Sequence, residues 1–293
     1  MDGASAETVV CVLGAPRSGT SLTARMLNLC GLYLGETDDL LPPGPENQAG
    51  FWEWRRAVDL NERVLRAVGG SRIAAPALPR GWEESPSLAE LRDEGAALIA
   101  ETFAGRRAWG WKDPRNSFTL PFWRALLARP VSSVICVRNP LDSAASGRRM
   151  AGPRHEMSEQ QAIEAWERYT AGAIVNSNDG ARLFVSYEEI LRDPHTEAER
   201  LARFARLEPP PGEVDEELAA LVDRKLQHHR TPPEAALSDR RLPASATSLY
   251  RALWPLLRGE PATSAADEEV ERLSRNLLAR DPERIVGPPA LRP

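Results

Sequence analysis

The chain has 293 residues, of which 42% are hydrophobic and 27% charged, and its formal net charge is −5. This length fits one large α/β domain or two small ones, and the apolar fraction allows a sizeable core. The negative charge argues against a nucleic-acid-binding protein with a broadly basic face, although a local basic pocket for a small anion remains open.

The cysteines and the N-terminal segment bear on the compartment. Cys11, Cys30 and Cys136 lie in apolar runs without a paired spacing, which is typical of buried, reduced thiols. The apolar run at residues 9–13 is too short for the core of a signal peptide, and no stretch approaches the length of a membrane span. We therefore expect a cytoplasmic protein without a membrane partner.

Four short segments are expected to form the strands of one sheet. Two of them, residues 8–13 and 131–137, are apolar and rich in β-branched residues, as parallel strands covered on both faces usually are. The other two expected strands are residues 107–112 and 182–186.

Helical segments alternate with these strands. Helices are expected at residues 21–30, 53–68, 88–103, 118–128, 141–149 and 163–174, with a long proline-rich surface loop at 33–50. The alternation favours an α/β fold of three layers, α/β/α, with a mostly parallel central sheet.

The chain is expected to form a single domain over residues 1–293. Its α/β core would cover residues 8–207, a mainly helical part would cover 208–285, and residues 286–293 would form a flexible tail. No internal repeat or low-complexity tract divides it further.

The first expected strand runs into a loop suited to an anion. The segment GAPRSGTS at residues 14–21 spaces its two glycines as a Walker A loop does, but Thr20 occupies the position of the lysine and Ser21 follows. The basic residue lies inside the loop, at Arg17. Backbone N–H groups and a helix N-terminus would still face one anionic group, whereas a turn that merely joins a strand to a helix needs only the glycines.

The end of the strand at residues 131–137 separates this loop from that of a kinase. A nucleotide kinase needs a carboxylate to help hold Mg²⁺, usually after a buried strand. Here the strand ends in Arg138, and a cation suits a second phosphate group of the ligand. A P-loop kinase of small molecules remains the alternative, and a non-catalytic nucleotide-binding protein is a third interpretation.

Four motifs in order resemble those of P-loop sulfotransferases. PRSGTS at residues 16–21 resembles the 5′-phosphosulfate loop, in the form found in bacterial sulfotransferases and tyrosylprotein sulfotransferases, which have arginine where the phenol and steroid enzymes have lysine. RNPLDSAAS at 138–146 resembles the motif that binds the 3′-phosphate. WKDPR at 111–115 resembles the lysine-bearing segment, and SYEEI at 186–190 the tyrosine-glutamate segment near the adenine.

This resemblance implies a fold like that of P-loop nucleoside triphosphate hydrolases and a defined donor. The donor would be 3′-phosphoadenosine 5′-phosphosulfate (PAPS), with 3′-phosphoadenosine 5′-phosphate (PAP) as product and no metal. The implied donor contacts are Arg17, Ser18, Gly19, Thr20, Ser21, Arg138, Ser146 and Tyr187. The reaction would be an in-line displacement onto a hydroxyl, in preference to an amine.

The resemblance also implies roles for two cations and a base. Arg17 would neutralise the 5′-phosphate and Lys112 would lie near the sulfuryl group, although a solvated lysine beside an Asp-Pro turn is the structural alternative for Lys112. The phenol and steroid enzymes use a histidine two residues after this lysine, where this chain has Pro114. Glu53, which follows a glycine and two aromatic residues, is the candidate base, unless it only stabilises a helix N-terminus.

Other positions are less decided. Glu36, Asp113 and His155 are the remaining candidates for the base, and a metal site at His228 and His229 is not expected. Leu22 stands where the phenol and steroid enzymes have a tryptophan that stacks on adenine, and their C-terminal Arg-Lys-Gly segment has no clear counterpart.

The acceptor and the partners follow only in outline. Trp52 and Trp82 lie next to expected loops and could line a pocket for a small, apolar or ring-containing acceptor. No nucleic-acid partner is expected, and a homodimer is left open.

Overall fold

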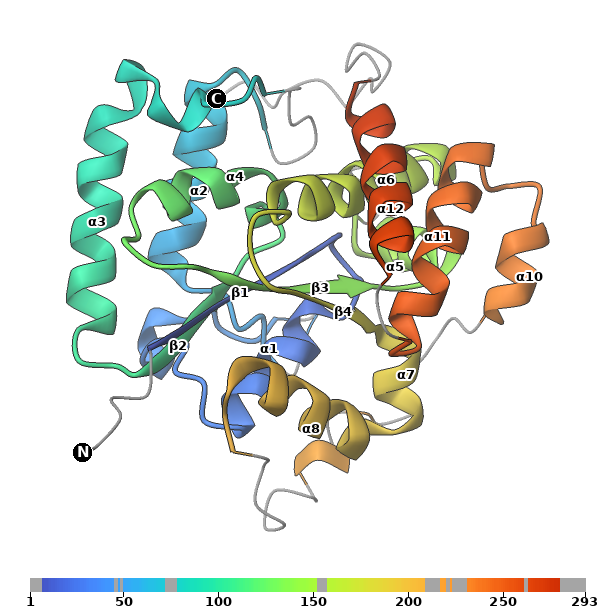
Figure 1. Cartoon of the computed structure of the whole chain (residues 1–293), viewed down its shortest axis with the longest axis horizontal. Coiled ribbons are helices and arrows are strands. Elements are labelled where there is room, and N and C mark those ends of the chain that lie inside the picture. The colour runs from blue at the N-terminus through green and yellow to red at the C-terminus, as the bar shows by residue number, and fades with distance from the viewer. Residues whose placement is uncertain are drawn as a thin grey trace.

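The centre of the fold is a parallel sheet (Figure 1). The structure is a computed structural model that describes residues 7–44, 47, 50–71, 78–151, 157–208, 217–219, 222, 231–260 and 263–279. Within these residues the sheet has four strands in the order β2-β1-β3-β4. They are β1 (Thr8–Gly14), β2 (Ala108–Lys112), β3 (Ser132–Val137) and β4 (Arg182–Ser186).

Helices connect and cover the strands. The larger ones are α1 (Thr20–Leu29), α2 (Arg55–Ala67), α3 (Ala89–Phe103), α4 (Asn116–Ala125), α5 (Pro140–Ala151), α6 (Glu159–Asn176), α8 (Pro194–Ala205), α11 (Ala244–Leu257) and α12 (Ser264–Leu278). The short ones are α7 (Tyr187–Arg192), α10 (Pro233–Ser238) and the 3₁₀ turns η1 (Thr37–Asp39), η2 (Trp82–Glu84) and η3 (Pro86–Leu88).

Helices lie on both faces of the sheet, as the sequence predicts. In β1, Cys11 and Leu13 belong to the larger core cluster, whereas Val10 and Val12 belong to the smaller one, because successive strand residues point to opposite faces. Figure 1 shows α1 and α8 below the sheet and α4, α6 and α12 above it. The predicted three-layer α/β/α fold is therefore confirmed.

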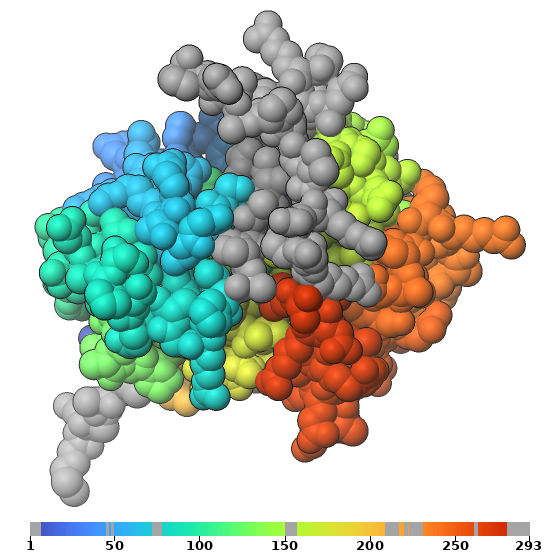
Figure 2. All heavy atoms as spheres, turned by 90° about the horizontal axis from the view of Figure 1, so that it is seen from above, coloured from blue at the N-terminus to red at the C-terminus, as the bar shows by residue number. Residues whose placement is uncertain are grey.

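The C-terminal helices extend the layer that contains α6. The ring of Tyr250 on α11 makes an edge contact with Trp166 on α6, with centroids 6.1 Å apart. Arg182, at the start of β4, forms ion pairs with Asp267 and Glu271 of α12. The α2–α3 region and the C-terminal helices lie at opposite ends of the face seen in Figure 2.

The predicted elements differ from the observed ones mainly at their ends. The helix predicted at residues 118–128 begins at Asn116, because Asn116 N already donates to Asp113 O in the preceding turn. The segment at residues 286–293, which we expect to be flexible, lies outside the described residues. None of the described helices is both long enough and apolar enough to cross a bilayer.

The register brings the ends of all four strands to one edge of the sheet. Val12 pairs with Lys112, Gly14 with Cys136, and Val137 with Ser186. The residues that follow the strands therefore emerge together. In α/β sheets, ligands bind outside these carboxyl ends, next to the strand at which the order reverses, which here is β1.

Candidate functional site

The loop between β1 and α1 is built to expose backbone N–H groups. A Cβ atom at Gly14 would overlap the carbonyl oxygen of Cys136, so only glycine allows β1 and β3 to pair here. Gly19 has φ +90°, precedes α1 directly and provides no side-chain cap. The first N–H groups of a helix have no partner within the helix, so this end of α1 can bind an anion.

Two further features of the loop fit an anionic ligand. Arg17 adopts a left-handed conformation with φ 69°, which is uncommon for a residue with a side chain. Ser18 is fully buried, yet its Oγ atom has no hydrogen-bond partner among the described residues. Buried hydroxyls are normally paired, so a loop with an unpaired one fits a ligand that supplies the partner.

The two residues predicted to bind the second phosphate, Arg138 and Ser146, both contact Arg17 of this loop. Arg17 Nε donates to Ser146 Oγ at 3.0 Å. Arg138 Nη1 donates to the carbonyl oxygen of Arg17 at 3.4 Å, and the Arg138 guanidinium lies 4.4 Å from the centre of the Tyr187 ring. Tyr187 also packs on Gly19, where an added Cβ atom would lie only 2.7 Å from its ring. These residues lie in the segments that directly follow β1, β3 and β4.

Asn139 and Asp142, which follow Arg138, bond to Thr231 and Glu188 from distant parts of the sequence. Asn139 Nδ2 donates to Thr231 O at 2.9 Å, and both the N–H and the hydroxyl of Thr231 donate to the Asp142 carboxylate, at 3.0 and 2.7 Å. Glu188 accepts from Asn139 N at 2.8 Å and from Ser186 Oγ at 2.9 Å. Burial raises the pKa of Glu188.

These contacts join the turn after Arg138 to the segment around Thr231, which precedes the C-terminal helices. Trp166 Nε1 adds a hydrogen bond to Arg138 O at 3.0 Å. In the sequence, the only local signal was the Asn-Pro pair after Arg138, which indicates a turn but not its partners.

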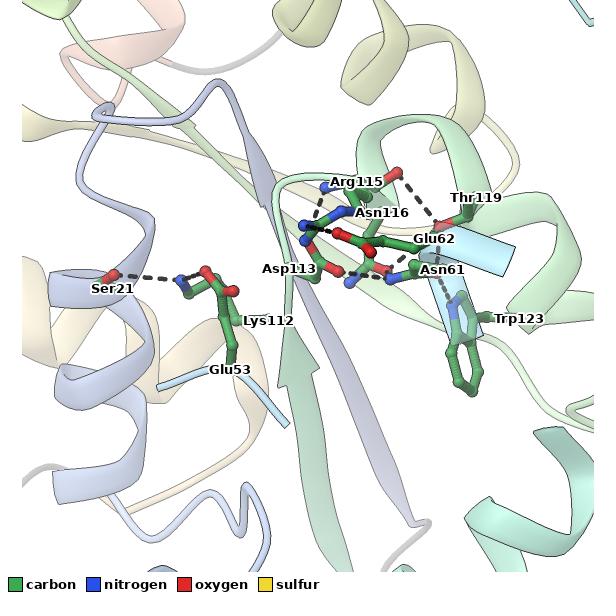
Figure 3. Close-up of polar contacts among 10 residues, drawn as sticks. All are labelled: Ser21, Glu53, Asn61, Glu62, Lys112, Asp113, Arg115, Asn116, Thr119 and Trp123. Carbon is green, nitrogen blue, oxygen red and sulfur yellow. Dashed lines mark hydrogen bonds and ion pairs between the residues drawn. The ribbon is translucent and has the colours of Figure 1, made fainter. Parts of the chain in front are cut away.

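Lys112 and Glu53 form a buried ion pair (Figure 3). Lys112 Nζ donates to Glu53 Oε1 at 2.6 Å and to Ser21 Oγ at 3.2 Å. The exposed fractions of the two side chains are 1% for Lys112 and 11% for Glu53. Lys112 is therefore buried rather than solvated, and it lies at the α1 end of the loop, opposite Arg138.

The extended segment before α2 carries Glu53 and is held by backbone pairing with residues 40 and 41. Trp52 has a left-handed backbone with φ 57°, and its ring lies 4.6 Å from the Arg25 guanidinium of α1. Leu41 N donates to Glu53 O at 2.8 Å. The residue that caps α2 is Trp54, without a side-chain hydrogen bond, so the Glu53 carboxylate bonds to Lys112 instead of to the helix N-terminus.

Asp113, one rival for the base, is surrounded by hydrogen-bond donors. Its Oδ1 accepts from Arg115 N and Arg115 Nη1, both at 2.9 Å, and its Oδ2 accepts from Asn61 Nδ2 at 2.8 Å. The side chain is fully buried. This arrangement leaves little of the carboxylate available for proton transfer.

The other rivals lie elsewhere. Glu36 is exposed and accepts from Tyr33 OH at 2.8 Å. His155, His228 and His229 lie outside the described residues.

The remaining predicted positions are core or rim. Trp82 is 9% exposed and packs in the larger core cluster, whereas Trp52 and Leu22 are half-buried beside the smaller one. The prediction of buried cysteines is confirmed, and burial raises the pKa of Cys136 to about 12 and that of Cys30 to about 11. In the part of the chain that the structure describes, no group of three or more His, Cys, Asp or Glu side chains is arranged to hold a metal ion.

Comparison with known proteins gives distant structural similarity. No curated protein matches the chain significantly. The sulfotransferase domain of the Synechococcus PCC 7002 olefin synthase is 16% identical, with 94% of this chain and 96% of that one covered and a TM-score of 0.42. The sulfotransferase domain from the curacin biosynthetic pathway is also 16% identical, with 92% and 97% covered and a TM-score of 0.41. A retinol dehydratase in complex with androsterone and the inactive cofactor PAP is 16% identical, with 93% and 81% covered and a TM-score of 0.37.

The sequence itself identifies the family. A model described as the Sulfotransferase family matches residues 10–211, more than half of the chain. This range contains the loop at residues 14–21, Lys112, Arg138 and Tyr187. The chain therefore belongs to the sulfotransferase family.

Proposed function

We propose that this protein transfers the sulfuryl group of PAPS to the hydroxyl group of a small acceptor. The observation that carries the proposal is the position of Lys112 Nζ, which lies 2.6 Å from Glu53 Oε1 and 3.2 Å from Ser21 Oγ of the donor loop. A cation and a carboxylate are thus adjacent at the end of an anion-binding loop, as sulfuryl transfer to a hydroxyl requires.

The donor would be held at both of its anionic ends. The loop N–H groups, with Ser18, Gly19, Thr20 and Ser21, would bind the 5′-phosphosulfate. Arg138 and Ser146 would bind the 3′-phosphate and Tyr187 would pack beside it, while Arg17 would neutralise the 5′-phosphate. The contacts of Arg17 support this assignment, because its side chain donates to Ser146 and its carbonyl oxygen accepts from Arg138, so the loop adjoins both residues.

The transfer step needs a base and a charge stabiliser. The acceptor oxygen forms a bond to sulfur, while the bond from sulfur to the 5′-phosphate oxygen breaks and its electron pair stays on PAP. Glu53 would take the hydroxyl proton of the acceptor. Arg17 and the loop amides would stabilise the negative charge that develops on the leaving oxygen, with Lys112 as a second cation near the sulfuryl group. The proposal requires no metal.

The acceptor would enter beside Glu53. Trp52, which is half-buried and directly precedes Glu53, would contribute an apolar wall for a ring-containing acceptor. We further propose that the whole chain acts as one cytoplasmic domain, with no nucleic-acid partner.

Calorimetry with the purified protein tests the donor. PAP is expected to bind without Mg²⁺ and more tightly than ADP or ATP–Mg²⁺. Preferential binding of ATP together with a Mg²⁺ requirement would reject the proposal in favour of a kinase. Transfer of label from ³⁵S-PAPS to a panel of hydroxyl and amine acceptors then tests the reaction.

A further inference from the structure

Two contacts join α2 and the residues just before it to the end of β2, and one of them is the Glu53–Lys112 pair itself. Glu53, just before α2, bonds to Lys112 at the end of β2. Asn61, on α2, bonds to Asp113, the residue that follows Lys112. Figure 3 shows the second contact beside the first, on the side facing α4.

Asn61 uses both ends of its amide in this contact. Its Nδ2 donates to Asp113 Oδ2 at 2.8 Å, while its Oδ1 accepts from Thr119 Oγ1 at 2.7 Å and from Trp123 Nε1 at 2.8 Å. Asn61 is fully buried. Its orientation is therefore fixed from both sides, and its polar atoms are satisfied as buried groups need to be.

Asp113 is fixed equally firmly. Its second oxygen accepts from Arg115 N and Arg115 Nη1. Arg115 Nη2 reaches back to α2 and forms an ion pair with Glu62 at 2.7 Å. Moving α2 away from the end of β2 would leave a buried carboxylate short of partners, which is strongly unfavourable.

This rigidity matters because Glu53 and Lys112 come from separate elements. Lys112 is covalently adjacent to Asp113, and a single residue separates Glu53 from the start of α2. Trp54, between Glu53 and α2, packs on Trp123 with ring centroids 6.1 Å apart, and Trp123 bonds to Asn61. The place of the α2 N-terminus relative to Lys112 thus depends on the Asn61 contacts.

We propose that Asn61 is a positioning residue, which acts through Asp113 to hold Glu53 at hydrogen-bonding distance from Lys112. The inference rests on the proposed function of that pair as base and charge stabiliser. A displacement of about 1 Å at a reacting group can cost a hundredfold in rate, so a contact that fixes two elements contributes to catalysis without touching the substrates.

An exchange of the amide and the carboxylate between Asn61 and Asp113, called the swap below, tests the proposal. Asn61→Asp alone places two carboxylates against each other. The double variant Asn61→Asp/Asp113→Asn restores a donor and an acceptor: the new amide can donate to the new carboxylate and still accept from Arg115. Val64→Ala is the matched control, because Val64 lies on the same helix, is fully buried and makes no hydrogen bond of the Asn61 cluster.

The main measurement needs no substrate. The coupling free energy between Glu53 and Lys112 is obtained from the unfolding of Glu53→Gln, Lys112→Met and the double variant, in each background. We expect Asn61→Asp to lower this coupling by about half or more, and the swap to restore most of it. Val64→Ala should lower overall stability and leave the coupling unchanged.

Kinetics supply the second measurement. At saturating acceptor, kcat should fall in Asn61→Asp and recover in the swap, while the affinity for PAP stays within about twofold of that of the original protein. An unchanged coupling in Asn61→Asp, or a loss of coupling that the swap does not restore, would overturn the proposal. If the coupling behaves as expected but no acceptor is ever sulfated, the positioning role stands and the proposed function fails.

Discussion

Arg17 Nε donates a hydrogen bond to Ser146 Oγ at 3.0 Å, which joins the loop after β1 to the helix after β3. Arg138 Nη1 donates to the backbone of the same Arg17. Lys112 instead lies against Ser21, at the helix end of the loop. The cations are thus divided between the two ends of the loop, which suits a ligand with two separate anionic groups.

Arg138 is predicted to discriminate in favour of the 3′-phosphorylated nucleotide. Arg138→Ala should weaken PAP binding by roughly 10- to 100-fold, because a hydrogen bond to a charged group contributes about 1.5–3 kcal/mol. Binding of adenosine 5′-monophosphate, measured by the same calorimetry, should change far less. The control is Arg148→Ala, an exposed arginine on the same helix as Ser146. Equal weakening of both nucleotides would make Arg138 a structural residue.

Glu53 is predicted to act in the transfer step and not in donor binding. Glu53→Gln keeps an acceptor for Lys112 but cannot take a proton, so kcat should fall by about 10²- to 10⁴-fold. PAP affinity should stay nearly unchanged in calorimetry. Glu36→Gln, which alters an exposed carboxylate, should leave kcat unchanged. An unaltered rate in Glu53→Gln would assign the base elsewhere.

Gly19 and Gly31 offer a matched pair of glycine substitutions. Both have φ near +90°, but a Cβ atom at Gly31 meets nothing within 4 Å, whereas one at Gly19 would lie 2.7 Å from the Tyr187 ring. Gly31→Ala should cost roughly 1–2 kcal/mol of stability through backbone strain. Gly19→Ala should cost more and also weaken PAP binding, since Tyr187 must move. Equal PAP affinity in the two variants would contradict a donor role for this corner.

Glu188 is predicted to lower the stability of the protein as the pH rises. Burial raises its pKa above the ordinary value of 4.5, so above about that pH the folded state retains a proton that the unfolded state has lost, and the free energy of unfolding falls with increasing pH. Glu188→Gln can still accept from Asn139 and donate to Ser186. Chemical denaturation from pH 4 to 8 should therefore show a flatter profile for this variant. An identical profile would mean that Glu188 is ionised at little cost.

The strands, and the loop and cations at their ends, could be predicted from local sequence patterns. The apolar runs predict β1 and β3, and the motifs that follow these two runs resemble known phosphate-binding segments. The register then brings Gly14, Lys112 and Val137, the residue before Arg138, to one edge of the sheet. Short-range patterns suffice here because each residue lies at the end of a strand or directly after it.

The contacts between distant segments could not be predicted from local sequence patterns. The spacing of 59 residues between Glu53 and Lys112 contains no signal that the two would pair, and Asn61 reads as an ordinary polar position on a helix. The sequence makes Asp113 a candidate base, whereas in the structure its carboxylate is occupied by three hydrogen bonds to Asn61 and Arg115. Pairing across the fold depends on packing, which a single sequence does not display.

The contacts of Thr231 predict how a shortened form of the protein would behave. A fragment that ends at residue 211, where the family match ends, would lack Thr231, α11 and α12. Asp142 would lose the N–H and hydroxyl of Thr231, and the edge of Trp166 that meets Tyr250 would be left uncovered. We therefore expect the recognisable family segment to be unable to fold alone, so that its recombinant expression requires the chain through the C-terminal helices.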